Sequence, residues 1–256
     1  MSCHLFTKAF FLSAALLPAC AALGADSFDD LLKKGDAFDR KFQATEALVY
    51  YLPAEKMQPK NVRLLVRLAR QYRHLMTDAT TRESKLRLGH TAQDYSQRTA
   101  ALAPGDAEAQ IQVAITLGKM LPILPTKEQV DASPRIKDSV DKTLRLDPRN
   151  DTAWHILGRW NRVLADISSV KRALAGMIYG SLPKGSNEEA ERDLQKAITL
   201  NPNRLMHYIE LGRVYAQMGR KDDARRFIEK GLAMPELEKD DPETKERGRE
   251  ALSKLR

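Results

Sequence analysis

Arginines recur at matching helical positions along this chain, and their side chains could bind carboxylates or phosphates. Arg70, Arg159 and Arg213 each directly follow a small residue, whereas the corresponding positions elsewhere hold Asp36 and Ile115. Further arginines lie within one or two helical turns of this column: Arg63, Arg67, Arg73 and Arg162. A guanidinium presents a planar fork of donors that matches the oxygens of a carboxylate or a phosphate. The pattern predicts a basic groove that binds an acidic partner.

The overall charge allows a second interpretation of the same arginines. The formal net charge of the 256-residue chain is +8, so arginine is expected on any exposed helix face, where its stem also covers apolar surface. Such a charge attracts acidic proteins and anionic membrane surfaces. Nucleic-acid binding would need aromatics among the basic residues, and only Tyr72 and Trp160 are nearby, so we expect no nucleic-acid partner.

Catalytic and metal-binding patterns are missing from the sequence. The histidines after residue 25 are His74, His90, His155 and His207, without the i, i+4 pairing of metal-binding helices. His155 lies beside Trp154 and is expected to be a packed or groove residue. The sequence has no glycine-rich phosphate loop after a strand and no Gly-x-Ser-x-Gly turn. We expect no catalytic residues, cofactor, metal or small-molecule substrate; an enzyme site between the groove and the inserted segments is the weaker alternative.

The elements that would position these arginines form a repeat of paired helices. A small residue recurs in the first helix of each unit: Gly35, Ala69, Ala114, Gly158 and Gly212. Pairs seven residues apart recur in the second helix: Ala47 and Ala54, Ala92 and Thr99, Ile136 and Thr143, Ala190 and Ala197, Ala224 and Gly231. Ile136 is the one poor fit, because small residues are what let two helices approach closely. Prolines close the units: Pro59, Pro104, Pro148, Pro202 and Pro235.

This pattern is typical of the tetratricopeptide (TPR) repeat and predicts an all-α, right-handed superhelix of about five helix pairs. The repeat domain spans residues 26–235, with units at about 28–61, 62–106, 107–150, 151–204 and 205–235. A polar C-terminal helix within 236–256 is expected to cap the array. Segments inserted between the paired helices of the middle three units either form a docking rim or only pack on the solenoid.

The first 25 residues have the layout of a secretory signal peptide. Lys8 precedes an apolar run from Ala9 to Leu17, and small residues follow to Ala25. Both cysteines, Cys3 and Cys20, lie in this segment. We therefore expect export to the periplasm or the exterior; a lipoprotein anchored through Cys20, acting in envelope assembly or trafficking, is the alternative.

The fourth unit resembles one family in particular. The segment from Trp154 to Trp160 contains Leu157 and Gly158, and an inserted segment then precedes Ala190, Ala197 and Pro202. This arrangement resembles the regulator-of-microtubule-dynamics family of TPR-like proteins. The resemblance implies an α-solenoid interaction protein, associated in animals with microtubules and organelle membranes. Because an exported bacterial protein would not meet tubulin, we expect the fold to carry over and the partner to differ, unless the host is eukaryotic.

Together these features predict a non-catalytic, exported scaffold that binds an acidic peptide or an anionic surface through its arginine-lined groove. The predicted groove residues are Arg63, Arg67, Arg70, Arg73, His155, Arg159, Arg162 and Arg213.

Overall fold

The computed structural model describes residues 26–169, 172–173, 176–177 and 183–255. The predicted signal peptide, residues 1–25, lies outside the described residues and remains a prediction. Helices are the only regular elements in the described part of the chain, which confirms the predicted fold class. They are α1 (Phe28–Asp39), α2 (Ala44–Met57), α3 (Val62–Asp78), α4 (Arg82–Leu102), α5 (Ala107–Met120), α6 (Thr126–Leu146), α7 (Asp151–Ala165), α9 (Asn187–Leu200), α10 (Leu205–Gln217), α11 (Lys221–Ala233) and α12 (Asp241–Ser253).

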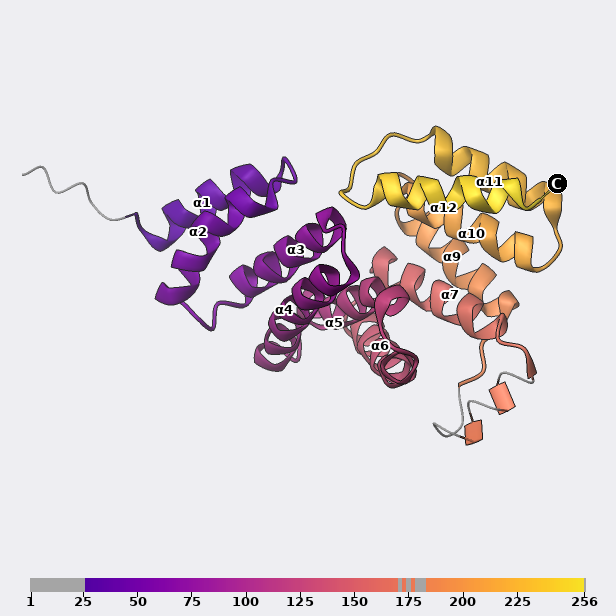
Figure 1. Cartoon of the computed structure of the whole chain (residues 1–256), viewed down its shortest axis with the longest axis horizontal. Helices are drawn as coiled ribbons and strands as arrows, with labels where there is room; N and C mark the ends of the chain where they lie inside the picture. Colours follow the sequence, from indigo (N-terminus) through magenta and orange to yellow (C-terminus); the bar gives the residue numbers. More distant parts are fainter. Residues whose placement is uncertain (1–25, 170–171, 174–175, 178–182, 256) are drawn as a thin grey trace, which may run out of the picture.

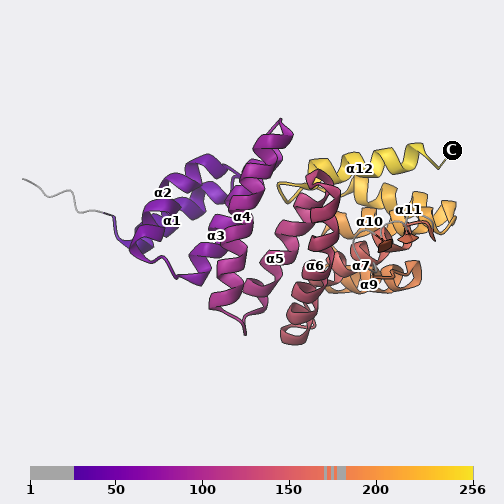
Figure 2. The same ribbon diagram turned by 60° about the horizontal axis from the view of Figure 1, so that its bottom comes forward.

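Ten of these helices form five hairpin-like pairs that follow one another along the long axis of the molecule (Figure 1). The pairs are α1 with α2, α3 with α4, α5 with α6, α7 with α9, and α10 with α11. Turning the molecule shows the same succession, with α12 lying across the C-terminal pair (Figure 2). Successive first helices also contact one another, α3 with α5, α5 with α7, and α7 with α10. We call the side formed by α1, α3, α5, α7 and α10 the inner face.

Small residues permit the close approach of the paired helices. A Cβ atom added to Gly158 would lie 2.7 Å from Leu194 Cγ and 3.1 Å from the Ala190 carbonyl oxygen. Ala190 and Ala197 on the facing helix are fully buried. Ile136, the poor fit in the sequence pattern, is also buried, in the core between α5 and α6.

The proline-containing turns end the first four second helices in the same way. The N–H of the residue after the helix donates to the carbonyl four residues earlier, as Gln58 does to Ala54 and Asn201 to Ala197. The closing proline comes next and cannot continue the helix. A polar side chain then caps the following helix in three of the turns: Asn61, Asp106 and Asn150.

The insertions of the second and third units mainly lengthen helices. The first insertion is divided between the end of α3 and the start of α4. The second forms a 3-10 turn, Leu121–Ile123, followed by the buried Leu124. Of the third insertion, Val170, Lys171, Leu174 and Ile178 lie outside the described residues. Whether these segments form a docking rim therefore stays a prediction.

Candidate functional site

The arginines of the first two units lie on the inner face, and most are held by acids or amides of a neighbouring helix. Arg67 makes a bidentate ion pair with Asp36 of α1, at 2.6 Å and 2.9 Å. Arg70 pairs with Asp39, the last residue of α1. Buried Arg73 instead donates to Thr116 and Gln112 of α5, at 3.0 Å and 2.9 Å. These guanidinium groups therefore join consecutive units.

A second charged cluster centres on Glu210 of α10. Arg162 of α7 donates to Glu210 at 2.7 Å, and Arg213 donates to its other oxygen at 2.8 Å. Burial alone would raise the pKa of Glu210, but Arg162, Arg213 and Arg159 together hold it well below its ordinary value. Arg159 is half-buried beside this cluster, and burial lowers its pKa. The sequence pattern pointed to the arginines but not to the acid they share.

His155 belongs to a buried polar chain between the fourth and fifth units. Its Nδ1 lies 3.2 Å from His207 Nδ1, and His207 Nε2 lies 3.0 Å from Asp151 Oδ2. Asp151 accepts the Nε2 proton of His207, so His155 donates to His207. Burial lowers the pKa of both histidines. His155 is thus a packed residue that links α7 to α10.

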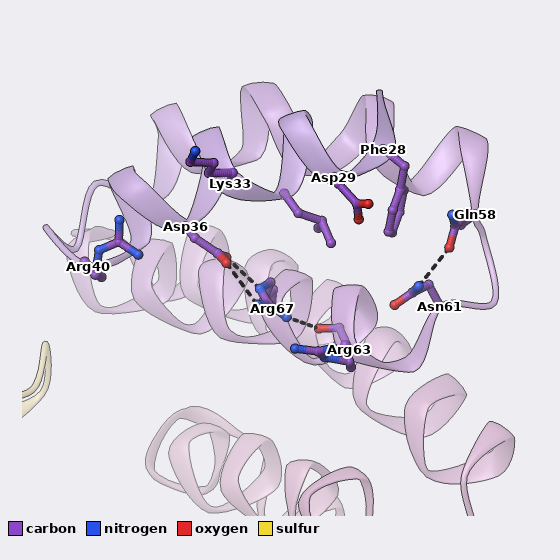
Figure 3. A pocket seen from close by; sticks show the side chains of 10 residues that line it. Phe28, Asp29, Lys33, Asp36, Arg40, Gln58, Asn61, Arg63 and Arg67 are labelled. Carbon is purple, nitrogen blue, oxygen red and sulfur yellow. Dashed lines mark hydrogen bonds and ion pairs between the residues drawn. The ribbon is translucent and has the colours of Figure 1, made fainter. Parts of the chain in front are cut away.

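An open pocket of about 490 Å³ lies between α1 and α3 at the N-terminal end of the inner face (Figure 3). Phe28 and Leu32 supply its apolar lining. Lys33, Arg40 and Arg63 are exposed around it, and no acid of the described residues lies within ion-pair distance of them. Arg63 therefore faces solvent without an ion-pair partner among the described residues, in a pocket that Asp29 also lines.

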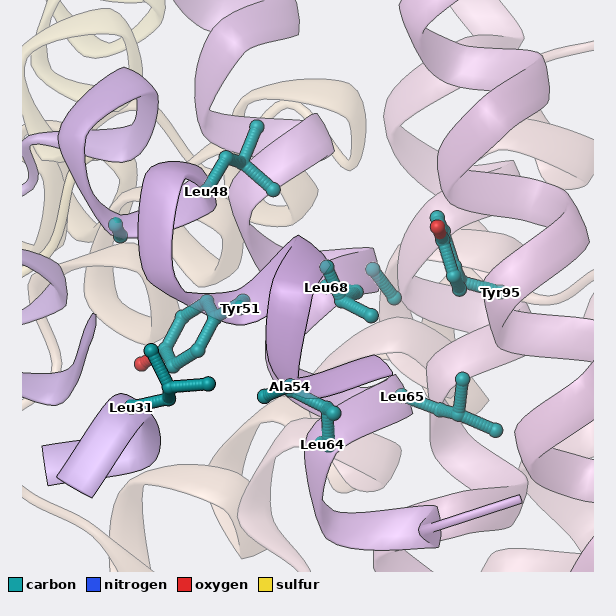
Figure 4. Close-up of a cluster of buried hydrophobic side chains, with 10 residues drawn as sticks. Leu31, Leu48, Tyr51, Ala54, Leu64, Leu65, Leu68 and Tyr95 are labelled. Carbon is teal, nitrogen blue, oxygen red and sulfur yellow. The ribbon is translucent and has the colours of Figure 1, made fainter. Parts of the chain in front are cut away.

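The wall behind the pocket is formed by α1, which packs tightly on the first core. A Cβ atom at Gly35 would lie 2.3 Å from the ring of Tyr51, so α1 rests directly on that ring. The Tyr51 hydroxyl donates to Asp36 at 2.5 Å and fixes the carboxylate that holds Arg67. Tyr51, Leu64 and Leu68 are fully buried in the same core (Figure 4).

The segment between α11 and α12 crosses back over the inner face. We call residues 234–240 the strap. It reaches the C-terminal end of α3, far away in sequence (Figure 1). Asp240 accepts from Lys119 at 2.6 Å and from Thr77 at 2.8 Å, and Lys239 pairs with Asp78 at 2.6 Å.

The residues that carried the family resemblance have structural roles. Trp154 donates its indole N–H to the Pro148 carbonyl at 2.9 Å, bracing the turn before α7. Trp160 donates to Ser133 of α6 at 3.0 Å, which ties the third unit to the fourth. Leu157 packs on the core between these units. Pro202 follows α9 in the closing turn.

The sequence analysis did not predict several charged residues of the site. Some are acids that pair with the arginines or with Lys119, and the others are further cations on the inner face. They are Lys33, Asp39, Arg40, Lys119, Glu210 and Asp240. A signal existed for Glu210, because it precedes Arg213 by three residues and so shares its helix face. None existed for Asp240, whose partners lie on other helices.

Two further properties bear on function. Among the described residues, no group of three or more histidines, cysteines, aspartates or glutamates is placed to hold a metal ion. Within the same ranges, no helix combines the length and apolar character required to cross a bilayer.

Helix pairs in a continuous superhelix, with an inner face lined by polar side chains, define a TPR-like helical repeat protein. A solved TPR protein from Thermus thermophilus has a similar fold, with a TM-score of 0.60 at 17% identity, covering 89% of this chain and 100% of that one. The family model described as Regulator of microtubule dynamics protein 1-3 matches residues 27–256, and the chain belongs to this family.

Two relatives show how far the similarity extends. Regulator of microtubule dynamics protein 1 of Caenorhabditis elegans is 28% identical over 178 residues, which are 70% of this chain and 78% of the relative. The Mus musculus protein of the same name is 26% identical over 213 residues, or 82% of this chain and 70% of the relative.

Proposed function

We propose that this chain is a non-catalytic interaction scaffold that binds an acidic peptide segment in the pocket between α1 and α3. The observation that carries the proposal is the exposed set of Lys33, Arg40 and Arg63, without ion-pair partners among the described residues, beside the apolar Phe28 and Leu32 of the same pocket. Most other arginines of the inner face already have partners within the chain. A peptide with carboxylates beside an apolar side chain would satisfy both the cations and the surface of Phe28.

Charge reversal at the pocket tests this proposal. Arg40→Glu with Arg63→Glu should weaken binding of a short fluorescent peptide rich in glutamate and leucine by at least about tenfold, because two attractive charges become repulsive. The affinity of the unaltered chain should fall with added salt, since the charges are exposed. Fluorescence anisotropy measures both effects, and vesicles containing phosphatidylserine serve as the comparison probe for an anionic surface.

A matched control keeps the change in net charge the same. Arg87→Glu with Lys196→Glu reverses two exposed cations on α4 and α9, which are second helices away from the pocket. This variant should bind the peptide as the unaltered chain does. Equal affinity in all three proteins would contradict the proposal.

The family name favours a second candidate, a microtubule-associated regulator, for a eukaryotic host. Co-sedimentation of residues 26–256 with microtubules tests it, and recovery of the chain only in the supernatant would exclude it.

A separate proposal is that residues 1–25 direct export. Bacterial expression followed by mass measurement of the mature chain checks cleavage near Ala25, and Cys20→Ser tests the lipoprotein alternative, since unchanged processing and membrane association would exclude it.

A further inference from the structure

The strap lies on the inner face in the way that an acidic ligand would. Beyond α11 the chain carries carboxylates at Glu236, Glu238, Asp240, Asp241 and Glu243, a concentration of negative charge opposite a basic surface. Two of these carboxylates engage cations of the repeat array. Glu238 lies 3.5 Å from Arg204, the residue before α10, and Asp240 lies 2.6 Å from Lys119 at the end of α5.

The receiving side for Asp240 is built from two helices of different units. Thr77 of α3 donates its hydroxyl and Lys119 of α5 donates its ammonium group to the same carboxylate oxygen. The Lys119 side chain is only 14% exposed, so its charge is directed at this position and not at bulk solvent. His74, one turn before Thr77, is buried with an Nδ1 that has no hydrogen-bond partner within the described residues. This combination forms a carboxylate site in the middle of the inner face.

The strap and α12 are held by different kinds of interaction. Buried Asp241, the first residue of α12, accepts from the backbone N–H groups of Leu237 and Glu238 in the strap at 2.8 Å and 2.9 Å, and so joins the strap to the start of α12. Beyond it, Gly248 faces Ile209 and Leu232, and Leu255 is buried in the last core. The strap itself contacts the array through ion pairs whose acids are about half exposed, and such pairs are individually weak. Because Asp241 also holds the backbone of Leu237 and Glu238, the strap can leave the array together with the first turn of α12 while the rest of α12 stays.

We propose that the inner face around Thr77, Lys119 and Arg204 is a second docking surface for an acidic segment, and that the strap is its resident competitor. This inference deepens the proposed function, because it extends the pocket between α1 and α3 into a longer track along the inner face. While the strap is bound to Thr77 and Lys119, it blocks this track at the third unit. A partner with enough carboxylates displaces the strap and binds to the middle of the inner face.

Neutralising the strap tests the proposal in the full chain. Glu238→Gln with Asp240→Asn removes the two carboxylates that reach the array and keeps their size. The probe is a fluorescent peptide with the sequence of residues 234–243, added in trans. The variant should bind this peptide at least about tenfold more tightly than the unaltered chain, and the gain should shrink in high salt. Equal affinity in the two proteins would overturn the proposal.

Two controls separate this result from other effects. Glu229→Gln with Glu246→Gln removes the same charge from exposed positions of α11 and α12 and should bind as the unaltered chain does. Adding Lys119→Glu to the strap variant should abolish its gain. Adding Arg40→Glu and Arg63→Glu to it should leave the gain intact, so failure of the pocket proposal would not be mistaken for failure of this one.

A measurement without the peptide keeps the proposal testable if the strap variant folds poorly. Lys119→Gln leaves the strap sequence unchanged and removes its main cation. Hydrogen exchange at residues 236–240 and in the first turn of α12 should then accelerate at least about tenfold, while exchange in α10 and in the rest of α12 stays as before. Unchanged exchange in the strap would contradict its release from this site.

Discussion

At the scale of single residues, the inner face is a set of charges that neutralise one another across unit boundaries. Glu210 shows the principle, because a buried carboxylate beside Arg162 and Arg213 stays ionised only while those cations remain. Removing one partner of such a cluster leaves an uncompensated buried charge, which costs about 3–5 kcal/mol. These arginines therefore contribute to the stability of the array.

Buried histidines make the stability of the chain depend on pH. Burial lowers the pKa of His74 to about 4, although Asp240 and Asp39 act in the opposite direction. The unfolded chain takes up a proton near pH 6.5, so the stability from the neutral ring is present above that pH and is lost as pH falls toward 4. His155 and His207 shift in the same direction.

His74→Gln should flatten this dependence. Between pH 7 and pH 5, we expect the free energy of unfolding of the unaltered chain to fall by about 2 kcal/mol more than that of the variant. Urea denaturation at the two pH values measures the difference. His90 is exposed on α4, so His90→Gln is the control and should follow the unaltered chain. Parallel curves for His74→Gln and the unaltered chain would contradict the prediction.

At the scale of helices, the last two pairs approach to backbone contact at one glycine of the first helix, Gly158 or Gly212. A Cβ atom at Gly212 would lie 2.5 Å from Ile228 Cγ1 and 3.0 Å from the Ala224 carbonyl oxygen. The neighbouring helix cannot yield easily, because one of these atoms is backbone. A glycine inside a helix costs about 1 kcal/mol in intrinsic helix propensity relative to alanine, so close packing must outweigh that cost here.

Gly212→Ala should therefore destabilise the chain by about 1–3 kcal/mol, since overpacking exceeds the gain in helix propensity. The matched control is Gly118→Ala in α5, where an added Cβ atom meets nothing within 4 Å. That change should be neutral or stabilise by up to about 1 kcal/mol. Thermal and urea denaturation compare them, and equal stabilities would show that helix approach at Gly212 is not limiting.

At the scale of the whole molecule, three buried clusters follow one another along the array instead of forming one central core. Each cluster is shared by neighbouring units, as expected when repeats contact only their neighbours. The strap is the exception, because it joins the segment after α11 to α3 and α5. The last cluster is closed by α12 and by Leu255, which is 7% exposed.

Removing the packing of Leu255 should destabilise only the helices next to it. Leu255→Ala leaves a cavity beside α10 and α11, at a cost of about 2–5 kcal/mol if the site cannot collapse. Hydrogen exchange should rise in α10 and α11 and remain unchanged in α1 and α2, since stability is transmitted between neighbouring units. Leu237→Ala, at a position 54% exposed in the strap, should change neither. A uniform rise along the chain would contradict the nearest-neighbour description.

The sequence alone determined the repeat architecture and the family, because small residues, closing prolines and helix caps act over short distances and repeat in register. Gly158 facing Ala190 could be read from spacing, and so could the final helix. Tertiary structure decided which charges are free. Whether Arg67 or Arg63 is available depends on Asp36, in another unit. The contacts of Asp240 with Thr77 and Lys119 could not be predicted from any local sequence pattern. The two helices that carry these partners are far from Asp240 in the sequence, and only the folded chain brings them close enough for an ion pair.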